Sequence, residues 1–111
     1  MALLPNIEQF QIVPINVNEN TANALANLKF NAKIHTFIAE NISGSPFDIN
    51  ELVNYFNINR KKYFNLTLLF KDKEDYDQEF LKNLKLALVN YQKALKNTLI
   101  VFNYEPLENI V

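Results

Sequence analysis

Residues 75–96 read DYDQEFLKNLKLALVNYQKALK and carry the clearest helical pattern in the chain. Acidic residues open this stretch, and Lys93 and Lys96 close it, which suits the helix macrodipole. We expect Asp75 to be the N-cap and Asn97 to follow the helix in a left-handed conformation. Apolar residues recur at intervals of three and four, as along the buried stripe of an amphipathic helix; they are Phe80, Leu81, Leu84, Ala87, Leu88, Tyr91, Ala94 and Leu95.

Two segments with strand character flank this helix. Residues 63–70 (YFNLTLLF) alternate with a period of two and place apolar side chains on both faces, which indicates a central strand. Residues 98–104 (TLIVFNY) are rich in β-branched and aromatic side chains and end shortly before Pro106. Strand, long helix and strand in this order are compatible with a right-handed crossover between two parallel strands.

The N-terminal third predicts two further strands. Residues 10–17 alternate in polarity but contain Pro14, which indicates an edge strand or a bulge. Residues 28–38 place their apolar side chains on one face as a strand, whereas as a helix they would scatter. We expect these two strands to pair as a hairpin with a long loop. The loop, residues 18–27, fits either a short helical turn or an irregular segment.

A break and a short helix lead to the central strand. Residues 41–46 (NISGSP) contain Gly44, the only glycine of the chain. Residues 48–56 begin with a capping pattern at Asp48 and are strongly apolar. The sequence predicts an α+β fold of order β-β-α-β-α-β, with a small mixed sheet of about four strands against one long amphipathic helix and one short helix. We expect one globular domain over residues 1–111.

Composition excludes several classes of protein. Hydrophobic residues make up 49% and charged residues 21% of the chain, as in ordered globular proteins, and the net charge of −1 offers no field for nucleic acid or an anionic membrane. Without cysteine there are no disulfides, thiolate metal sites or cysteine nucleophiles. No signal peptide or membrane span is apparent. We expect a cytoplasmic protein, or one assembled into a virion.

The residues offer little to catalysis. One glycine excludes a P-loop and a dinucleotide fingerprint, and a single histidine, His35, excludes a site of several histidines. The acidic residues 72–77 lack the spacing of a calcium loop and are explained by the start of the long helix. We therefore expect a protein that is not an enzyme, with no catalytic residue, metal, cofactor or small-molecule substrate.

One basic cluster lies between the short helix and the central strand. Leu52, Ile58, Tyr63 and Leu66 are spaced like the buried positions of a helix-turn-helix unit, which residues 48–69 therefore resemble. The resemblance implies a recognition helix in the major groove, opened by Asn59, Arg60, Lys61 and Lys62. Two observations oppose it: the helix would overlap the best strand pattern, and the net charge of −1 attracts phosphate weakly.

The N-terminal strand and the C-terminal tail are apolar, and we expect them to form edges that pair with a partner. Candidate interface residues are Val13, Ile15, Val17, Leu107 and Ile110. We expect a non-catalytic protein–protein interaction or structural assembly subunit that binds a protein or self-associates as a homo-oligomer, and does not bind a membrane. The alternative is the small DNA-binding regulator. Frequent lysine and asparagine indicate AT-rich coding, as in phages and mobile elements, so a virion or tail component or a host-directed inhibitor fits this class.

Overall fold

The computed structural model describes residues 2–4, 9–21, 24, 28–30, 33–72, 74 and 76–107, with the backbone alone for residues 2–4 and 28–30. Its strands are β1 (Ala2–Leu4), β2 (Gln9–Ile12), β3 (Ile15–Val17), β4 (Leu28–Phe30), β5 (Ile34–Gly44), β6 (Arg60–Phe70), β7 (Thr98–Phe102) and β8 (Glu105–Pro106). Its helices are α2 (Ile49–Asn59) and α3 (Gln78–Ala94).

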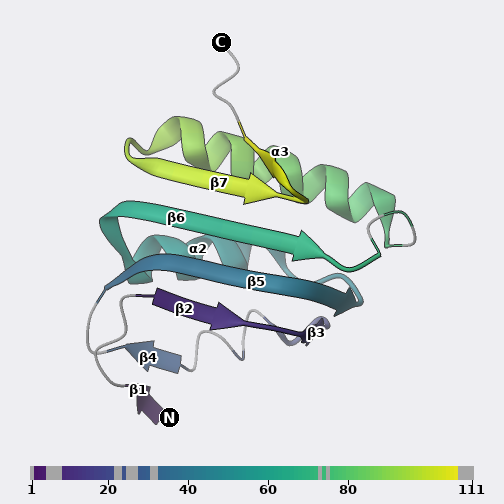
Figure 1. The fold of residues 1–111 in the computed structure, drawn as a ribbon, viewed down its shortest axis with the longest axis horizontal. Helices are drawn as coiled ribbons and strands as arrows, with labels where there is room; N and C mark the ends of the chain where they lie inside the picture. The colour runs from purple at the N-terminus through teal and green to yellow at the C-terminus, as the bar shows by residue number, and fades with distance from the viewer. Residues whose placement is uncertain are drawn as a thin grey trace.

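Within these residues the fold is a mixed, mostly parallel sheet with two helices (Figure 1). The six-stranded sheet has the order β2-β5-β6-β7-β8, and β3 pairs with β5 beyond the end of β2. β2, β3, β5, β6 and β7 are parallel, whereas β8 is antiparallel to β7. β1 and β4 form a separate parallel pair. This confirms the predicted fold class and the crossover between β6 and β7.

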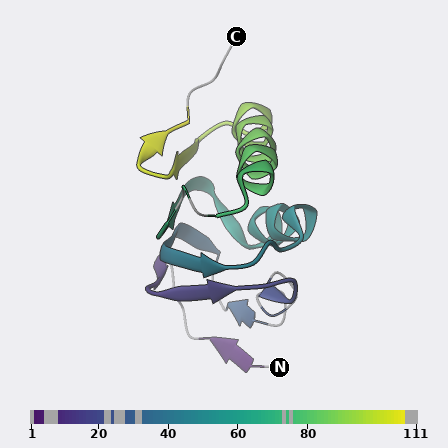
Figure 2. The ribbon, with the colours of Figure 1, turned by 90° about the vertical axis from the view of Figure 1, so that its right-hand side faces the viewer.

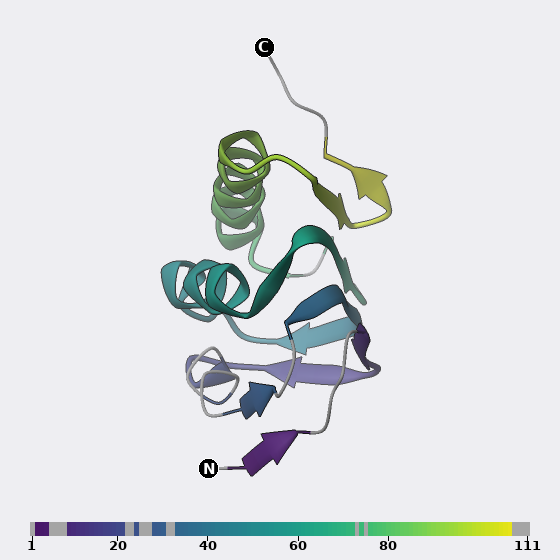
Figure 3. The ribbon, with the colours of Figure 1, turned by 90° about the vertical axis from the view of Figure 1, so that its left-hand side faces the viewer.

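Both helices lie on the same face of the sheet (Figures 2 and 3). α2 connects β5 to its parallel neighbour β6, and α3 connects β6 to its parallel neighbour β7. Crossovers between parallel strands are almost always right-handed, and two successive ones that step in the same direction put their helices on one side. Among the residues that the structure describes, no helix therefore covers the other face of the six-stranded sheet.

The core lies between this sheet and the helices. The predicted stripe of α3 is confirmed at Phe80, Leu81, Leu84, Leu88 and Tyr91, all of which are buried, whereas Ala94 is exposed. They meet the helix-facing side chains of β5, β6 and β7, which include Phe37, Phe64, Leu66, Leu68 and Ile100. Burying one such side chain contributes about 1.5–3 kcal/mol.

The pairing of the N-terminal strands differs from the predicted hairpin. β2 and β3 run parallel to β5, with Ile15 beside Ile42. A parallel neighbour is reached by a crossover of a dozen or more residues, and residues 18–33 provide that length. The hairpin was therefore wrong, and the described part of the segment has a turn followed by helical backbone. The edge position is confirmed, because a bend at Pro14 separates β2 from β3 at the edge of the sheet.

Strand β5 extends further than expected. The segment predicted as one strand, residues 28–38, contains β4 and the start of β5, and β5 continues to Gly44. Asn41, with φ of 52°, lies within an irregularity in the ladder between β5 and β6, after which the strand resumes. The break predicted at residues 41–46 therefore begins only after Gly44.

The helices start at aspartate caps. Asp48 caps α2 by accepting a hydrogen bond of 3.0 Å from the Glu51 N–H, as predicted, although α2 continues to Asn59. In α3 the N-cap is Asp77, which accepts a hydrogen bond of 2.9 Å from the Phe80 N–H. The predicted cap, Asp75, lies outside the described residues. The preceding residues form their own turn, closed by a hydrogen bond of 3.0 Å from the Tyr76 N–H to the Asp72 carbonyl, so the helix begins later.

The far edge of the sheet is closed by a hairpin and by a side chain of α3. β7 turns into β8 through Asn103 and Tyr104, whose φ values of 51° and 70° suit a type I′ turn. The Ile100 N–H of β7 donates to the side-chain oxygen of Gln92 at 3.0 Å, and the Gln92 amide donates to the Leu107 carbonyl at 2.6 Å. Gln92 is buried, so no water can pair with these two backbone groups, and its amide provides the hydrogen bonds that a neighbouring strand would otherwise make.

Candidate functional site

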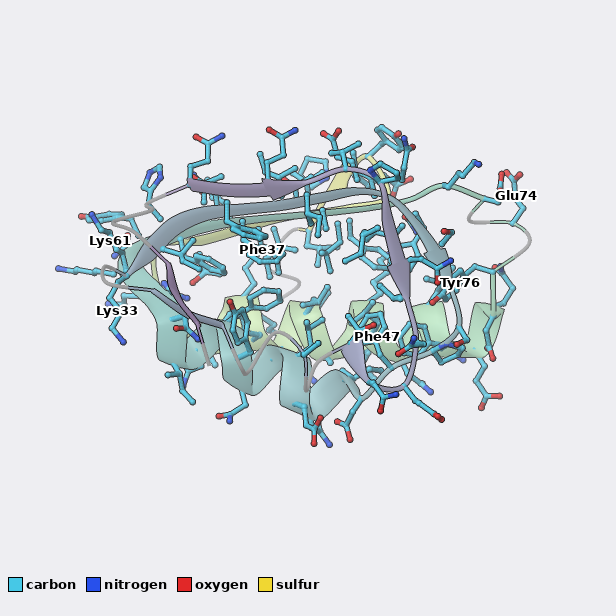
Figure 4. All side chains as sticks on the ribbon, turned by 90° about the horizontal axis from the view of Figure 1, so that it is seen from below. Lys33, Phe37, Phe47, Lys61, Glu74 and Tyr76 are labelled. Atoms are coloured by element: carbon cyan, nitrogen blue, oxygen red, sulfur yellow. The ribbon has the colours of Figure 1, made fainter. Side chains whose placement is uncertain are left out.

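The helix-free side of the sheet forms a surface that we call the open face. Two rows of side chains cross it, given by the registers between the strands. The first row is Gln9, Thr36, Asn65 and Leu99, and the second is Gln11, Ile38, Thr67 and Val101. Figure 4 shows the sheet edge-on, with Phe37 pointing toward the helices and other side chains projecting from the opposite face.

The open face carries no charge along these two rows. Its polar members are amides and hydroxyls, and its apolar members gather toward β7, where the side chain of Leu99 is 67% exposed. Tyr63, two residues before Asn65 on β6, is also exposed and extends the same face. Interface cores have this composition, since charged residues are depleted there and tyrosine is enriched.

A basic end borders the open face where the parallel strands begin. It is defined by Lys33, His35, Arg60, Lys61, Lys62 and Lys96, which lie at or just before the starts of β5, β6 and β7. All of them except Lys96 line one open surface groove together with Tyr63. A second groove adjoins it and includes Lys96. The fold thus brings basic residues from three parts of the chain to one end of the sheet.

Arg60 serves the fold rather than the groove. Its guanidinium donates to the hydroxyl oxygen of Thr98 at 2.6 Å and to the carbonyl oxygens of Lys61 and Lys62 at 2.9 Å and 2.8 Å. It also lies over the ring of Phe64, 5.3 Å from the centroid, and over that of Tyr91, at 5.8 Å. These contacts tie the starts of β6 and β7 to the end of α3, so most of the donors of Arg60 are already used.

The opposite end of the molecule is acidic (Figure 4, near Glu74). The acidic end is defined by Asp48, Glu51, Asp72, Glu74, Asp77, Glu79 and Glu105, which lie at the starts of the two helices or beyond the ends of β6 and β7. Lys71 also lies there, and Lys82 and Lys85 of α3 line one groove together with Glu74 and Glu105. The cause is local: each helix starts at the carboxyl end of a strand, and carboxylates stabilise helix N-termini. Because α2 and α3 run in the same direction, their acidic N-termini lie at the same end of the molecule.

The helix-turn-helix unit over residues 48–69 does not form. α2 ends at Asn59, and Arg60 begins β6 directly, so the expected recognition helix is a strand. The alternation of Phe64 and Leu66 toward the core, with a parallel neighbour on each side of β6, outweighs the helical spacing. The Asn59 side chain donates to the Tyr55 carbonyl at 2.9 Å and so belongs to the end of α2.

The five interface residues expected from the sequence do not form one surface. Val17 and Leu107 are buried in the core, Ile15 is half-buried, and Val13 is exposed in the bend before β3. Ile110 lies outside the described residues. β3 and the segment around Leu107 also lie toward opposite edges of the sheet. The sequence did contain the alternation of Asn65, Thr67, Leu99 and Val101, but it gave no sign of which face would stay uncovered.

The described surface offers few other groups that could bind a ligand. A hydrogen bond of 2.7 Å joins His35 Nδ1 and the Thr36 hydroxyl. Over the described ranges, no group of three or more histidine, aspartate or glutamate side chains is arranged to hold a metal ion. In the same ranges, no helix is long and apolar enough to cross a membrane. Comparisons with models of known families, with curated proteins and with solved structures found no match.

Proposed function

We propose that this protein is a non-catalytic interaction or assembly subunit that binds a protein surface through its open face. The observation that carries the proposal is a largely parallel sheet whose second face has no helix over it in the described part of the chain, and whose two central rows have no charge. Parallel sheets occur almost only where both faces are covered. A partner would supply the missing layer, and the uncharged rows would form the centre of the contact.

The energetics of such a contact favour the β7 side of the open face. Burying an exposed leucine contributes about 1.5–3 kcal/mol, and Leu99 is two-thirds exposed in the free chain. Tyr63 adds a large aromatic side chain of the kind that often anchors an interface. A cysteine-free chain needs no oxidising compartment, and we place the interaction in the cytoplasm or in an assembled particle.

The test uses two leucines with similar exposure on opposite sides of the molecule. Leu99, on the open face, is 67% exposed, and Leu86, on α3, is 61% exposed. Native complexes formed in the source cells would be cross-linked and sized for the wild type, Leu99→Asp and Leu86→Asp. Wild type and Leu86→Asp are expected to enter one defined complex that Leu99→Asp does not enter. Equal incorporation of both variants, or no complex with the wild type, would overturn the proposal.

A second candidate function is nucleic-acid binding at the basic end. The observation in its favour is that Lys33 and His35 of the β5 region lie in the same groove as Lys61, Lys62 and the exposed ring of Tyr63. Lysines beside an aromatic ring can bind a phosphate backbone while a base stacks on the ring. Against it, the two rows of the open face carry no lysine that could follow a backbone away from the groove.

This alternative can be tested by fluorescence anisotropy with single-stranded and duplex oligonucleotides over a range of salt. Nucleic-acid binding predicts a clear salt dependence, and loss of affinity in the variant Lys61→Ala/Lys62→Ala. The matched control is Lys82→Ala/Lys85→Ala, which removes the same charge from exposed positions of α3. Equal affinities for the two variants would exclude the groove as the binding site.

A further inference from the structure

Building on the proposed function, we propose that the open face is covered by a second copy of this chain. The two sheets would stack face to face with their strands antiparallel. The basic end of each copy would then lie over the acidic end of the other. This arrangement follows from the symmetry of a dimer, the charges at the two ends and the gradient of polarity across the face.

Symmetry leaves two ways to stack two identical sheets face to face with their strands aligned. A closed dimer has a two-fold axis, which must lie in the plane of the contact. If the axis runs along the strands, the strands of the two copies are parallel, and the basic end lies over the basic end. If the axis runs across the strands, they are antiparallel, and Lys61 and Lys62 of one copy approach Asp72 and Glu74 of the other. Charge complementarity selects the second arrangement.

The polarity gradient selects the same arrangement. The β2 side of the open face carries Gln9 and Gln11, and the β7 side carries Leu99 and Val101. With the axis across the strands, each strand lies over its own copy, so leucine and valine pack on each other. The glutamines of one copy then face the glutamines of the other, and their amides can donate hydrogen bonds to and accept them from each other. With the axis along the strands, glutamines would cover leucine and valine instead.

The area of the face suits a reversible dimer. The four strands that the rows cross, at about 4.8 Å each, span about 19 Å, and the rows with their flanking residues span about 25 Å along the strands. Two such faces would bury on the order of 1,000 Å², the size of a weak, transient interface. We therefore expect association in the micromolar range.

The first experiment is sedimentation velocity of the pure protein from 1 to 200 µM, for wild type, Leu99→Asp and Leu86→Asp. Wild type and Leu86→Asp are expected to dimerise with similar dissociation constants, and Leu99→Asp to dimerise at least tenfold more weakly. A wild type that stays monomeric at 200 µM overturns self-association. The proposed function would still be judged separately, by the complexes cross-linked in the source cells. A dimer that Leu99→Asp leaves unchanged overturns self-association through the open face.

The second experiment determines the orientation. Because the chain has no cysteine, single introduced cysteines can be joined by a short bismaleimide cross-linker without background. Tyr63 lies near the start of β6, Lys71 directly follows its end at Phe70, and both residues are exposed. Antiparallel stacking predicts cross-links between Tyr63→Cys and Lys71→Cys protomers and none between two Tyr63→Cys protomers. The reverse pattern would establish parallel stacking and overturn the proposed arrangement.

The charges provide an independent check on the same dimer. The variant Lys61→Glu/Lys62→Glu makes both ends acidic, and Asp72→Lys/Glu74→Lys makes the acidic end more basic. Each variant alone is expected to dimerise at least tenfold more weakly than wild type at low salt, and their mixture is expected to form a heterodimer. Single variants that dimerise as well as wild type would show that the ends do not face each other.

Discussion

The substitution Gly44→Ala is expected to lower the free energy of unfolding by about 3–5 kcal/mol. Gly44 ends β5 with φ of +109°, beside Val17 of β3. A Cβ built there would lie 2.0 Å from the Val17 carbonyl oxygen and 2.8 Å from the Val17 nitrogen. Both groups are backbone, so no rotation of a side chain can relieve the overlap.

The magnitude follows from two contributions. Holding a non-glycine residue in this conformation costs about 1–3 kcal/mol. Separating β3 from β5 also loses backbone hydrogen bonds worth about 0.5–1.5 kcal/mol each, among them the bond of 2.8 Å from the Ser45 N–H to the Val17 carbonyl. Val17 is buried in the core, so its side chain would be partly exposed as well.

Urea unfolding followed by circular dichroism measures this loss, with Ser45→Ala as the control. Ser45 is exposed and keeps its backbone hydrogen bond as alanine, so the control should differ from wild type by less than about 0.5 kcal/mol. The midpoint temperature of thermal unfolding should be about 10–25 °C lower for Gly44→Ala than for the wild type. A loss below about 1 kcal/mol would refute the reasoning, because it would mean that β3 can leave the sheet without consequence.

Three further substitutions test other parts of the fold by the same measurement. Gln92→Leu should lower the free energy of unfolding by about 2–4 kcal/mol, because it leaves two buried backbone groups unpaired. The control Asn90→Leu, at an exposed position of the same helix, should change it little. Equal losses in the two variants would refute the role of the Gln92 amide. Tyr104→Gly should stabilise by about 1 kcal/mol, because glycine adopts the φ of 70° without strain; a destabilised variant would show that the exposed ring packs. Burial raises the pKa of Tyr55 to about 12, and its hydroxyl has no hydrogen-bond partner in the part of the chain that the structure describes. The folded pKa lies above the unfolded one, so this tyrosine leaves stability unchanged below pH 10 and lowers it by about 2–3 kcal/mol as the pH rises to 12. Tyr55→Phe should therefore keep or slightly raise stability at pH 7 and lose less of it at alkaline pH; identical alkaline curves would contradict this.

The elements that local periodicity defines could be predicted from the sequence. Phe80, Leu84 and Leu88 recur at helical spacing and lie in the core, and Phe64 and Leu66 alternate as a central strand should. The direction of strand pairing could not be predicted, because it depends on where a distant segment returns. Residues 18–33 contain no tight-turn signal, and a long hairpin loop and a crossover look alike in one sequence.

The candidate site depends even more on information that is not local. Asn65, Thr67 and Leu99 belong to ordinary strand patterns, and they form a surface only because both crossovers put their helices on the other face. The basic cluster was visible in the sequence, but its meaning changed with the fold. Arg60 turned out to tie the starts of β6 and β7 to the end of α3, whereas Lys33 and His35 joined the groove from another strand.

The charge separation shows how local rules add up in a parallel fold. Asp48 and Asp77 each cap one helix, an arrangement that would leave no net polarity if the helices were antiparallel. Here α2 and α3 both start at the carboxyl ends of strands, so their acidic starts reinforce each other, and the basic starts of β5 and β6 lie at the opposite end. A net charge of −1 conceals this polarity. Helix capping therefore also orients the proposed dimer, because the charges at the two ends favour the same antiparallel stacking as the polarity gradient across the uncharged central rows.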